Sequence, residues 1–395
     1  MKKIDIHEYL RKYRHSHPEF KDFDKGNIIS KEKSKYSDII EVCTTNVYPQ
    51  LLKFDNEEIF VWDHTYWMLY RRFLLGIFRF HPNTSSIDDL SDFLRSFQYL
   101  FLSLRFSMLP AYAYYFASKY KKLNKLICHF RMYSDKEEEK KFKEVHGAQF
   151  FEQLMDFAQS QVYLHELRHY GYRNNKDFFL RESGIVKSIF KQYDSVLSKL
   201  PQDNPINGED RLWDTYYHFA NIEKLDMIEE ICCDIFPIVE FVSNFGQKEK
   251  ENSKEEIFAA YVSTIRYVFE MQNIFIQVER KWKSLKYIFD DILNGKEPEF
   301  KKFSSDENDT KRIVHSRIAI ESVFAAHILG INPSSIMVEN ELFDSDFYKE
   351  ALQKSASDSF DHMAISTAAV YAKEISENFS LSQLRSARDL LIGWY

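Results

Sequence analysis

The segment that decides the fold begins at Phe150, ends at Gly171 and reads FFEQLMDFAQSQVYLHELRHYG. Its apolar residues recur three and four positions apart, as at Leu154 and Ala158, which is the spacing of one face of an α-helix. A glycine after the last periodic residue is typical of a helix end. The sequence therefore predicts an amphipathic helix over about residues 150–170.

The composition of the whole chain favours the same kind of structure. Of 395 residues, only 10 are glycine and 9 are proline, so few positions suit turns, and long helices are favoured over many short strands. Phenylalanine and tyrosine are abundant, with 35 and 24 residues, and such large side chains bury much apolar area in a core. We predict a mainly α fold, α+β at most, with a small β element near Ile59 to Trp62.

Polar, charge-dense segments divide the chain into two predicted regions. One such segment covers residues 246–256, and the other covers residues 295–311. We therefore predict a core over residues 1–245 and a helical C-terminal module over residues 257–395, with a polar linker inside the module. Within this module, the apolar spacing over residues 257–289 predicts one long amphipathic helix or two stacked helices.

Charge and cysteine content narrow the class of protein. A formal net charge of -7 disfavours a dedicated nucleic-acid binder, because phosphate contacts usually require a basic face. Four cysteines do not make a disulfide framework in a chain of this length, which indicates a reducing compartment. Neither a signal peptide nor a membrane-spanning stretch is recognisable. We expect a cytoplasmic protein without nucleic-acid or membrane partners, and the oligomeric state stays open.

The pattern H-E-x-x-H occupies positions 165–169 of the predicted helix. Residues four positions apart lie on one helix face, so the imidazoles of His165 and His169 would both reach one zinc ion. Glu166 would lie beside that ion and take a proton from a zinc-bound water, which the metal has acidified. Chance alone gives the pattern roughly 0.03 times in a chain of this composition. We predict one Zn²⁺ per chain, with Glu166 as the catalytic residue.

A catalytic zinc site needs a third protein ligand, and E-x-x-x-D at Glu230 and Asp234 supplies a candidate. This pattern lies in a second apolar helical segment, about residues 222–236. Carboxylates four positions apart share one face, so Glu230 would ligate the zinc while Asp234 accepts a hydrogen bond from the outer nitrogen of a ligand histidine. Other acidic residues remain open as the third ligand: Glu223, Asp226 and Glu229.

The two helical segments together resemble the active-site signature of gluzincin metallopeptidases, in particular the minimal forms in which E-x-x-x-D is followed closely by Phe. The resemblance covers about Phe150 to Glu240 and implies a zinc-dependent endopeptidase that hydrolyses a protein or peptide substrate. Similar minimal gluzincins act in phage exclusion and in cleaving repressors, so it also implies a role in bacterial defence or regulation. The implied roles are metal ligand for His165, His169 and Glu230, general base and acid for Glu166, and support of a ligand histidine for Asp234.

Two other classes of protein remain open. A non-catalytic helical adaptor would bind protein partners through aromatic-rich faces, and its H-E-x-x-H residues would be ordinary, partly buried side chains. A small helical ribonuclease of the HEPN type would carry R-x(4–6)-H. This spacing occurs from Arg11 to His17 and from Arg211 to His218, but roughly two such matches are expected by chance. The metal content of the protein separates the peptidase from both alternatives.

Overall fold

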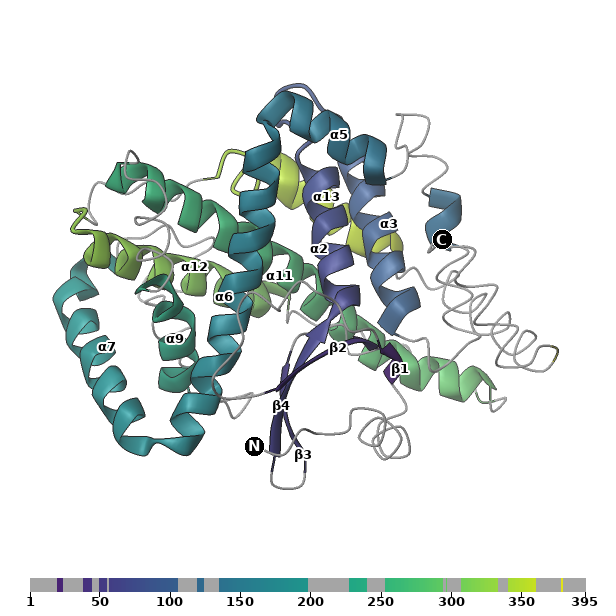
Figure 1. The fold of residues 1–395 in the computed structure, drawn as a ribbon. Helices are drawn as coiled ribbons and strands as arrows, with labels where there is room; N and C mark the ends of the chain where they lie inside the picture. Colours follow the sequence, from purple (N-terminus) through teal and green to yellow (C-terminus); the bar gives the residue numbers. More distant parts are fainter. Residues whose placement is uncertain are drawn as a thin grey trace. The chain divides into compact units, whose positions relative to one another are not determined.

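A computed structural model of the chain shows a mainly α-helical protein, as the sequence predicts (Figure 1). Among its helices, none is both long and apolar enough to cross a membrane within the part of the chain that the structure describes. The described residues are 20–23, 38–44, 50–54, 57–105, 119–123, 135–197, 227–239, 253–293, 296, 307–332, 340–359 and 378.

Among the described elements, the strands come first and the helices follow. The strands are β1 (Phe20–Phe23), β2 (Asp38–Thr44), β3 (Gln50–Phe54) and β4 (Glu57–Asp63). The helices are α2 (His64–Ile77), α3 (Ile87–Arg105), α5 (Asp135–His146), α6 (Ala148–Asn174), α7 (Lys176–Leu197), α9 (Met227–Ile235), α11 (Lys254–Leu293), α12 (Glu307–Leu329) and α13 (Asp346–Ser359).

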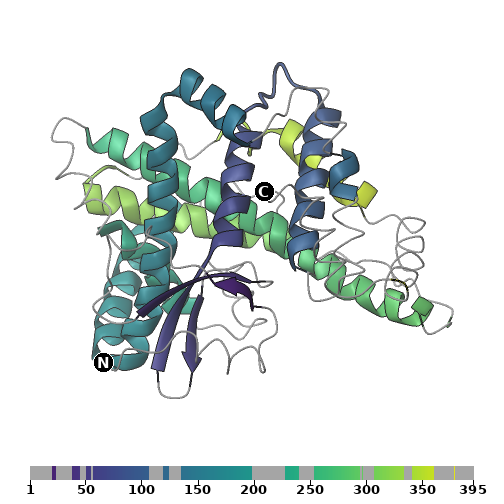
Figure 2. The same cartoon turned by 45° about the vertical axis from the view of Figure 1, so that its right-hand side comes forward.

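The chain forms two compact units, and unit 1 contains the sheet. Unit 1 combines the segments Met1–Phe142, Ile274–Phe303 and Glu341–Tyr395. Its strand order is β1-β2-β4-β3, with β2 and β4 parallel and the outer pairs antiparallel. The predicted β element lies within β4, which leads directly into α2 (Figure 2). Its β-branched and aromatic residues favour extended backbone.

The helices of unit 1 pack around aromatic rings. Phe275 of α11 stacks on Phe101 of α3 with a centroid distance of 4.1 Å, and it also stacks on Phe97 at 5.8 Å. Helix α13 packs on α3, where Gln98 donates a hydrogen bond of 3.1 Å to the hydroxyl of Ser355. Unit 1 therefore has an aromatic core with neutral polar contacts.

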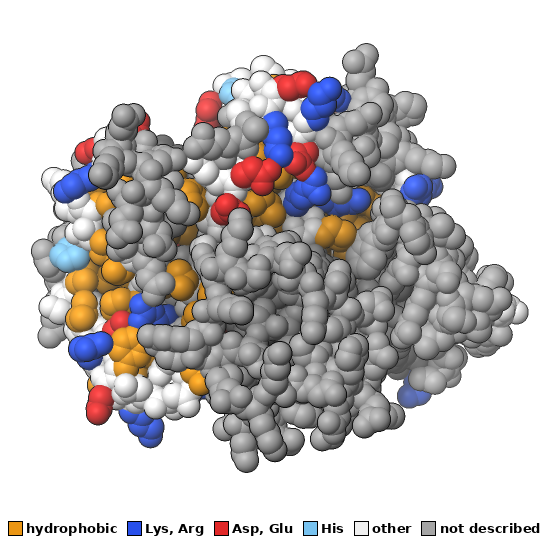
Figure 3. Space-filling view, viewed as in Figure 1, with side chains coloured by type: hydrophobic (Ala, Val, Ile, Leu, Met, Phe, Trp, Pro, Cys, Tyr) orange, Lys and Arg blue, Asp and Glu red, His pale blue; other side chains and the backbone are white. Residues whose placement is uncertain are grey.

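Unit 2 contains the segments that carry the sequence patterns. It combines Lys143–Asn273 with Ser304–Asn340. In it α9 lies between α6 and α7 and also packs on α12 (Figure 1). The side chains of Cys232 and Cys233 are fully buried in this core. On the outside, α7 keeps exposed apolar residues such as Leu180, and hydrophobic side chains gather on the left of the surface, over α7 (Figure 3).

The end of α6 differs from the sequence prediction. The helix continues through Gly171 and ends at Asn174. A Cβ atom at position 171 would lie 3.3 Å from the ring of Phe178, so the missing side chain allows close packing of α7. The helix ends instead where the N–H of Asn175 bonds to the carbonyl of Gly171 and α7 begins. Glycine at this position serves contact between helices and does not end the helix.

The grouping of segments into units differs from the sequential division at residue 245. Helix α12, from the predicted C-terminal module, belongs to the same unit as α6 and α9 because it packs on α7 and α9. The segment predicted as one long helix or two is the single helix α11, which begins in unit 2 and ends in unit 1. The predicted linker over residues 295–311 lies largely outside the described residues, and α12 begins at its end.

Candidate metal centre

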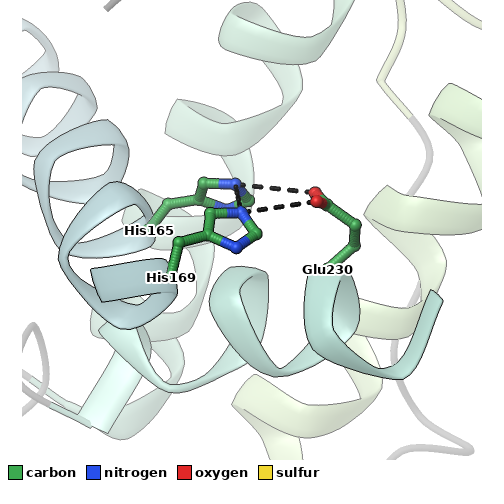
Figure 4. A group of neighbouring side chains, drawn as sticks. All are labelled: His165, His169 and Glu230. Carbon is green, nitrogen blue, oxygen red and sulfur yellow. Dashed lines mark hydrogen bonds and ion pairs between the residues drawn. The ribbon is translucent and has the colours of Figure 1, made fainter. Parts of the chain in front are cut away.

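Helices α6 and α9 bring together the three side chains that the sequence patterns predict as ligands. His165 and His169 point from one face of α6 toward Glu230 on α9 (Figure 4). The Nε2 atoms of the two histidines lie 3.2 Å apart. Glu230 places Oε1 at 3.3 Å from Nε2 of His169 and Oε2 at 3.7 Å from Nε2 of His165. These three residues are called the His–His–Glu group below.

The separations within the His–His–Glu group fit a tetrahedral metal site. Zinc bonds of about 2.0–2.1 Å place two ligand atoms about 3.3 Å apart. The nitrogen–nitrogen distance of 3.2 Å and the shorter nitrogen–oxygen distance of 3.3 Å match this separation between two ligand atoms. The group could therefore hold a metal ion. Two imidazoles and one carboxylate are a donor set that suits zinc and leaves a fourth position for water.

Carboxylates hold the outer nitrogen of each imidazole. Nδ1 of His165 lies 2.9 Å from Oδ1 of Asp234, and Nδ1 of His169 lies 2.7 Å from Oε1 of Glu229. An ionised carboxylate only accepts hydrogen bonds, so each Nδ1 donates, and in the neutral ring the lone pair is on Nε2. Glu229, an alternative third ligand in the sequence, thus lies on the outer side of His169. The other two alternatives, Glu223 and Asp226, lie outside the described residues.

The surrounding charges determine the protonation of His165. Burial would lower the pKa of this imidazole, but the hydrogen bond with Asp234 and the negative charges of Asp234, Glu230 and Glu166 raise it to about 9. Without metal the ring is therefore protonated at neutral pH. A metal ion at this site has to displace that proton, which makes its binding dependent on pH.

Glu166 lies beside the His–His–Glu group. It follows His165 on α6 and is half-buried. Its negative charge contributes to the raised pKa of His165 and, together with burial and other carboxylates, to the raised pKa of the Cys233 thiol on α9. Glu166 is thus close enough to both helices to interact electrostatically with His165 and Cys233.

Asp234 is fixed by residues that no local pattern indicates. Arg317 of α12 donates from Nε to Oδ2 at 2.8 Å and from Nη2 to Oδ1 at 2.6 Å. Gln161 of α6 donates to the backbone carbonyl of Asp234 at 3.0 Å. Burial would raise the pKa of Asp234, but the charge of Arg317 and the hydrogen bond with His165 lower it to about 2. Asp234 is thus an ionised, buried carboxylate.

Comparisons with known proteins give no family for this arrangement. No protein-family model matches the sequence, and neither a curated protein nor a solved structure matches it. The residues that fit the ribonuclease spacing, Arg11 to His17 and Arg211 to His218, lie outside the described residues. The functional interpretation therefore depends on the geometry of α6, α9 and α12.

Proposed function

We propose that the protein is a zinc-dependent endopeptidase. The observation that carries the proposal is the convergence of His165, His169 and Glu230 while a carboxylate holds the outer nitrogen of each imidazole. A single buried histidine is satisfied by one partner on each nitrogen. Here the Nε2 atoms of two histidines face the same position, and a carboxylate contacts the Nδ1 atom of each ring. Histidines that bind a metal commonly have such an outer partner.

In the proposed mechanism, His165, His169 and Glu230 would hold the zinc. A bound zinc ion supplies a Lewis acid that polarises a carbonyl and lowers the pKa of water. Glu166 would accept a proton from the attacking water and later donate it to the leaving amine. Asp234 and Glu229 would hold a proton on Nδ1 of each imidazole and orient the ring so that Nε2 faces the metal.

The substrate of the proposed reaction is a peptide bond in a protein or peptide. A role in bacterial defence or regulation is a further part of the proposal, and it is supported by the resemblance to minimal gluzincins alone. The non-catalytic adaptor is the alternative, and it requires no metal.

The test begins with the metal content of the purified wild-type protein after mild chelation, beside His165→Ala. We expect about one zinc per wild-type chain and none in the variant, because loss of one of three ligands opens the site. A wild type that takes up no metal, even after reconstitution, would contradict the proposal and favour the adaptor.

The second step separates metal binding from catalysis with Glu166→Gln. We expect this variant to keep its zinc and to lose hydrolysis of a peptide library by about 10²–10⁴-fold, the usual contribution of general acid–base catalysis. The matched control is Glu152→Gln, which removes an exposed glutamate from the same helix. Wild-type turnover by metal-loaded Glu166→Gln would rule out Glu166 as the base.

A further inference from the structure

We propose that Arg317 is a positioning residue of the candidate metal centre, acting through Asp234 on His165. It would hold the Asp234 carboxylate in one orientation, and the carboxylate would in turn hold the imidazole with Nε2 toward the metal position. This inference rests on the proposed metal site and adds a residue from α12, far from both sequence patterns. Three features of unit 2 support it.

The first feature is the two-point contact between Arg317 and Asp234. The guanidinium donates one hydrogen bond to each carboxylate oxygen, at 2.8 Å and 2.6 Å. Such a planar, paired contact fixes the orientation of a carboxylate as well as its position. The oxygen Oδ1 is shared with Nδ1 of His165 at 2.9 Å. Rotation of the carboxylate would therefore break its contacts with both partners.

The second feature is the setting of the guanidinium. Its central carbon lies over the Phe269 ring, 4.4 Å from the ring centroid, a cation–π contact that helps to hold the guanidinium in place. Asp234 is buried, so its charge has little water to compensate it, and Arg317 supplies the compensating charge. Gln161 fixes the backbone of Asp234 at the same time. Asp234 is therefore held at its backbone carbonyl and at both oxygens of its carboxylate.

The third feature is the state of Glu321, which lies one turn beyond Arg317 on α12. An ionised carboxylate there would compete with Asp234 for the guanidinium. Glu321 is buried and accepts a hydrogen bond of 2.9 Å from the hydroxyl of Tyr261. Burial and the negative charge of Asp234 raise its pKa well above the ordinary value. Because Glu321 is neutral, it does not compete for the guanidinium, and the charge of Arg317 pairs with Asp234.

Unit 2 provides a matched comparison in the pair Arg168 and Glu182. Nη1 of Arg168 lies 3.0 Å from Oε1 of Glu182, and its guanidinium carbon lies 5.2 Å from the centroid of the Phe178 ring. The two arginines are similarly covered, with 18% and 21% of their side chains exposed. Glu182 accepts a hydrogen bond from the hydroxyl of Tyr172, whereas Asp234 contacts the ligand histidine His165. The two pairs thus share a part-buried arginine over an aromatic ring, whereas only the acid of the Arg317 pair is shown in contact with a ligand histidine.

The experiment compares Arg317→Met with Arg168→Met in the full chain. Zinc affinity is measured by competition with a chromophoric chelator, and ligand geometry is followed by visible absorption of the Co²⁺-loaded protein. We expect Arg317→Met to weaken zinc binding about 10–100-fold, the usual effect of losing an outer-shell partner, and to change the cobalt spectrum. Arg168→Met should change neither. Arg317→Lys should recover part of the affinity, since it restores the charge but not the fork.

A double-mutant cycle with Asp234→Asn tests whether Arg317 acts through Asp234. If it does, Asp234→Asn combined with Arg317→Met loses no more zinc affinity than Asp234→Asn alone. Additive losses overturn the inference, and so does wild-type affinity in folded Arg317→Met. If Arg317→Met does not fold, Arg317→Lys completes the same cycle. If the wild-type protein binds no metal, the proposed function itself is wrong. If the wild type binds metal but substitution of Arg317 does not change the affinity, only this inference is wrong.

Discussion

The two units bury different kinds of polar side chain. Among the described residues, the buried polar side chains of unit 1 are all uncharged, namely Ser91, Ser96, Gln98, Ser103 and Ser355. Those of unit 2 include six that can carry charge, namely His169, Glu182, Asp234, Arg266, Glu270 and Glu321. A buried hydroxyl costs little when a helix carbonyl accepts its proton, whereas a buried charge is costly even when it is paired.

This difference indicates what each unit is built for. Ser103 and Ser355 of unit 1 donate to carbonyls three residues earlier in their own helices, at 2.7 Å and 2.8 Å, so the core around them is simply apolar packing. In unit 2, Asp234 contacts His165 of the His–His–Glu group, and the surroundings of these two side chains raise the pKa of His165 and lower that of Asp234. Such clusters occur preferentially where a protein performs chemistry. Three substitutions test this difference between the units.

The largest effect is expected for Phe101→Ala in unit 1. The ring is fully buried and stacks on Phe275, so its removal should lower the free energy of unfolding by about 3–5 kcal/mol. Urea unfolding measures the loss, and chelator competition should find the zinc affinity of the folded variant unchanged. The control is Leu180→Ala, where a side chain that is 64% exposed should matter by less than about 0.5 kcal/mol. Weakened zinc binding in folded Phe101→Ala would show that the unit 1 core also supports the site.

An intermediate effect is expected for Glu229→Gln in unit 2. The amide keeps the size of the side chain but weakens the hydrogen bond at Nδ1 of His169, so zinc affinity should fall about tenfold. Chelator competition measures the change, and urea unfolding should show nearly wild-type stability because Glu229 is only half-buried. Glu152→Gln makes the same charge change away from the site. Equal zinc affinities in the two variants would remove Glu229 from the metal centre.

The smallest effect is expected for Glu321→Gln, as a pH dependence of stability. Because the folded-state pKa of Glu321 is raised, the native chain keeps a proton that the unfolded chain releases above its ordinary pKa of 4.5. Wild-type stability therefore contains a contribution that is full below this pKa and is lost as pH rises toward the folded-state value. Glutamine does not titrate, so the variant lacks this pH dependence. Urea unfolding should therefore show that the free energy of unfolding of Glu321→Gln rises relative to that of the wild type between pH 5 and pH 8. A difference between the proteins that does not change with pH would contradict the buried neutral acid.

Local patterns were enough to predict the elements that carry the ligands. Apolar spacing predicts α6 and α9, and the four-residue spacing places His165 and His169 on one face. Glu230 was predicted as the third ligand, but its neighbour Glu229 could not be excluded, because the rotation of α9 is set by tertiary burial of residues such as Cys232. Only packing decides which carboxylate faces inward.

Residues that arrive from distant segments could not be predicted at all. Arg317 lies 83 residues beyond Asp234, and Gln161 lies 73 residues before it, with no shared periodicity. Gly171 was misleading for a similar reason, because its value lies in contact with Phe178 and not in the local backbone. Local sequence shows which residues share one face of a helix, but which other helix packs on that face depends on the whole fold.

The ribosome makes Asp234 83 residues before it makes Arg317. At about 5–20 residues per second, this interval lasts roughly 4–17 s. Throughout it, the residues of α6 and α9 have been translated, but the arginine that pairs with the buried carboxylate of Asp234 has not. We therefore expect the proposed hydrolytic site to mature only after α12 has been translated, which would protect the nascent chain and its neighbours from premature cleavage.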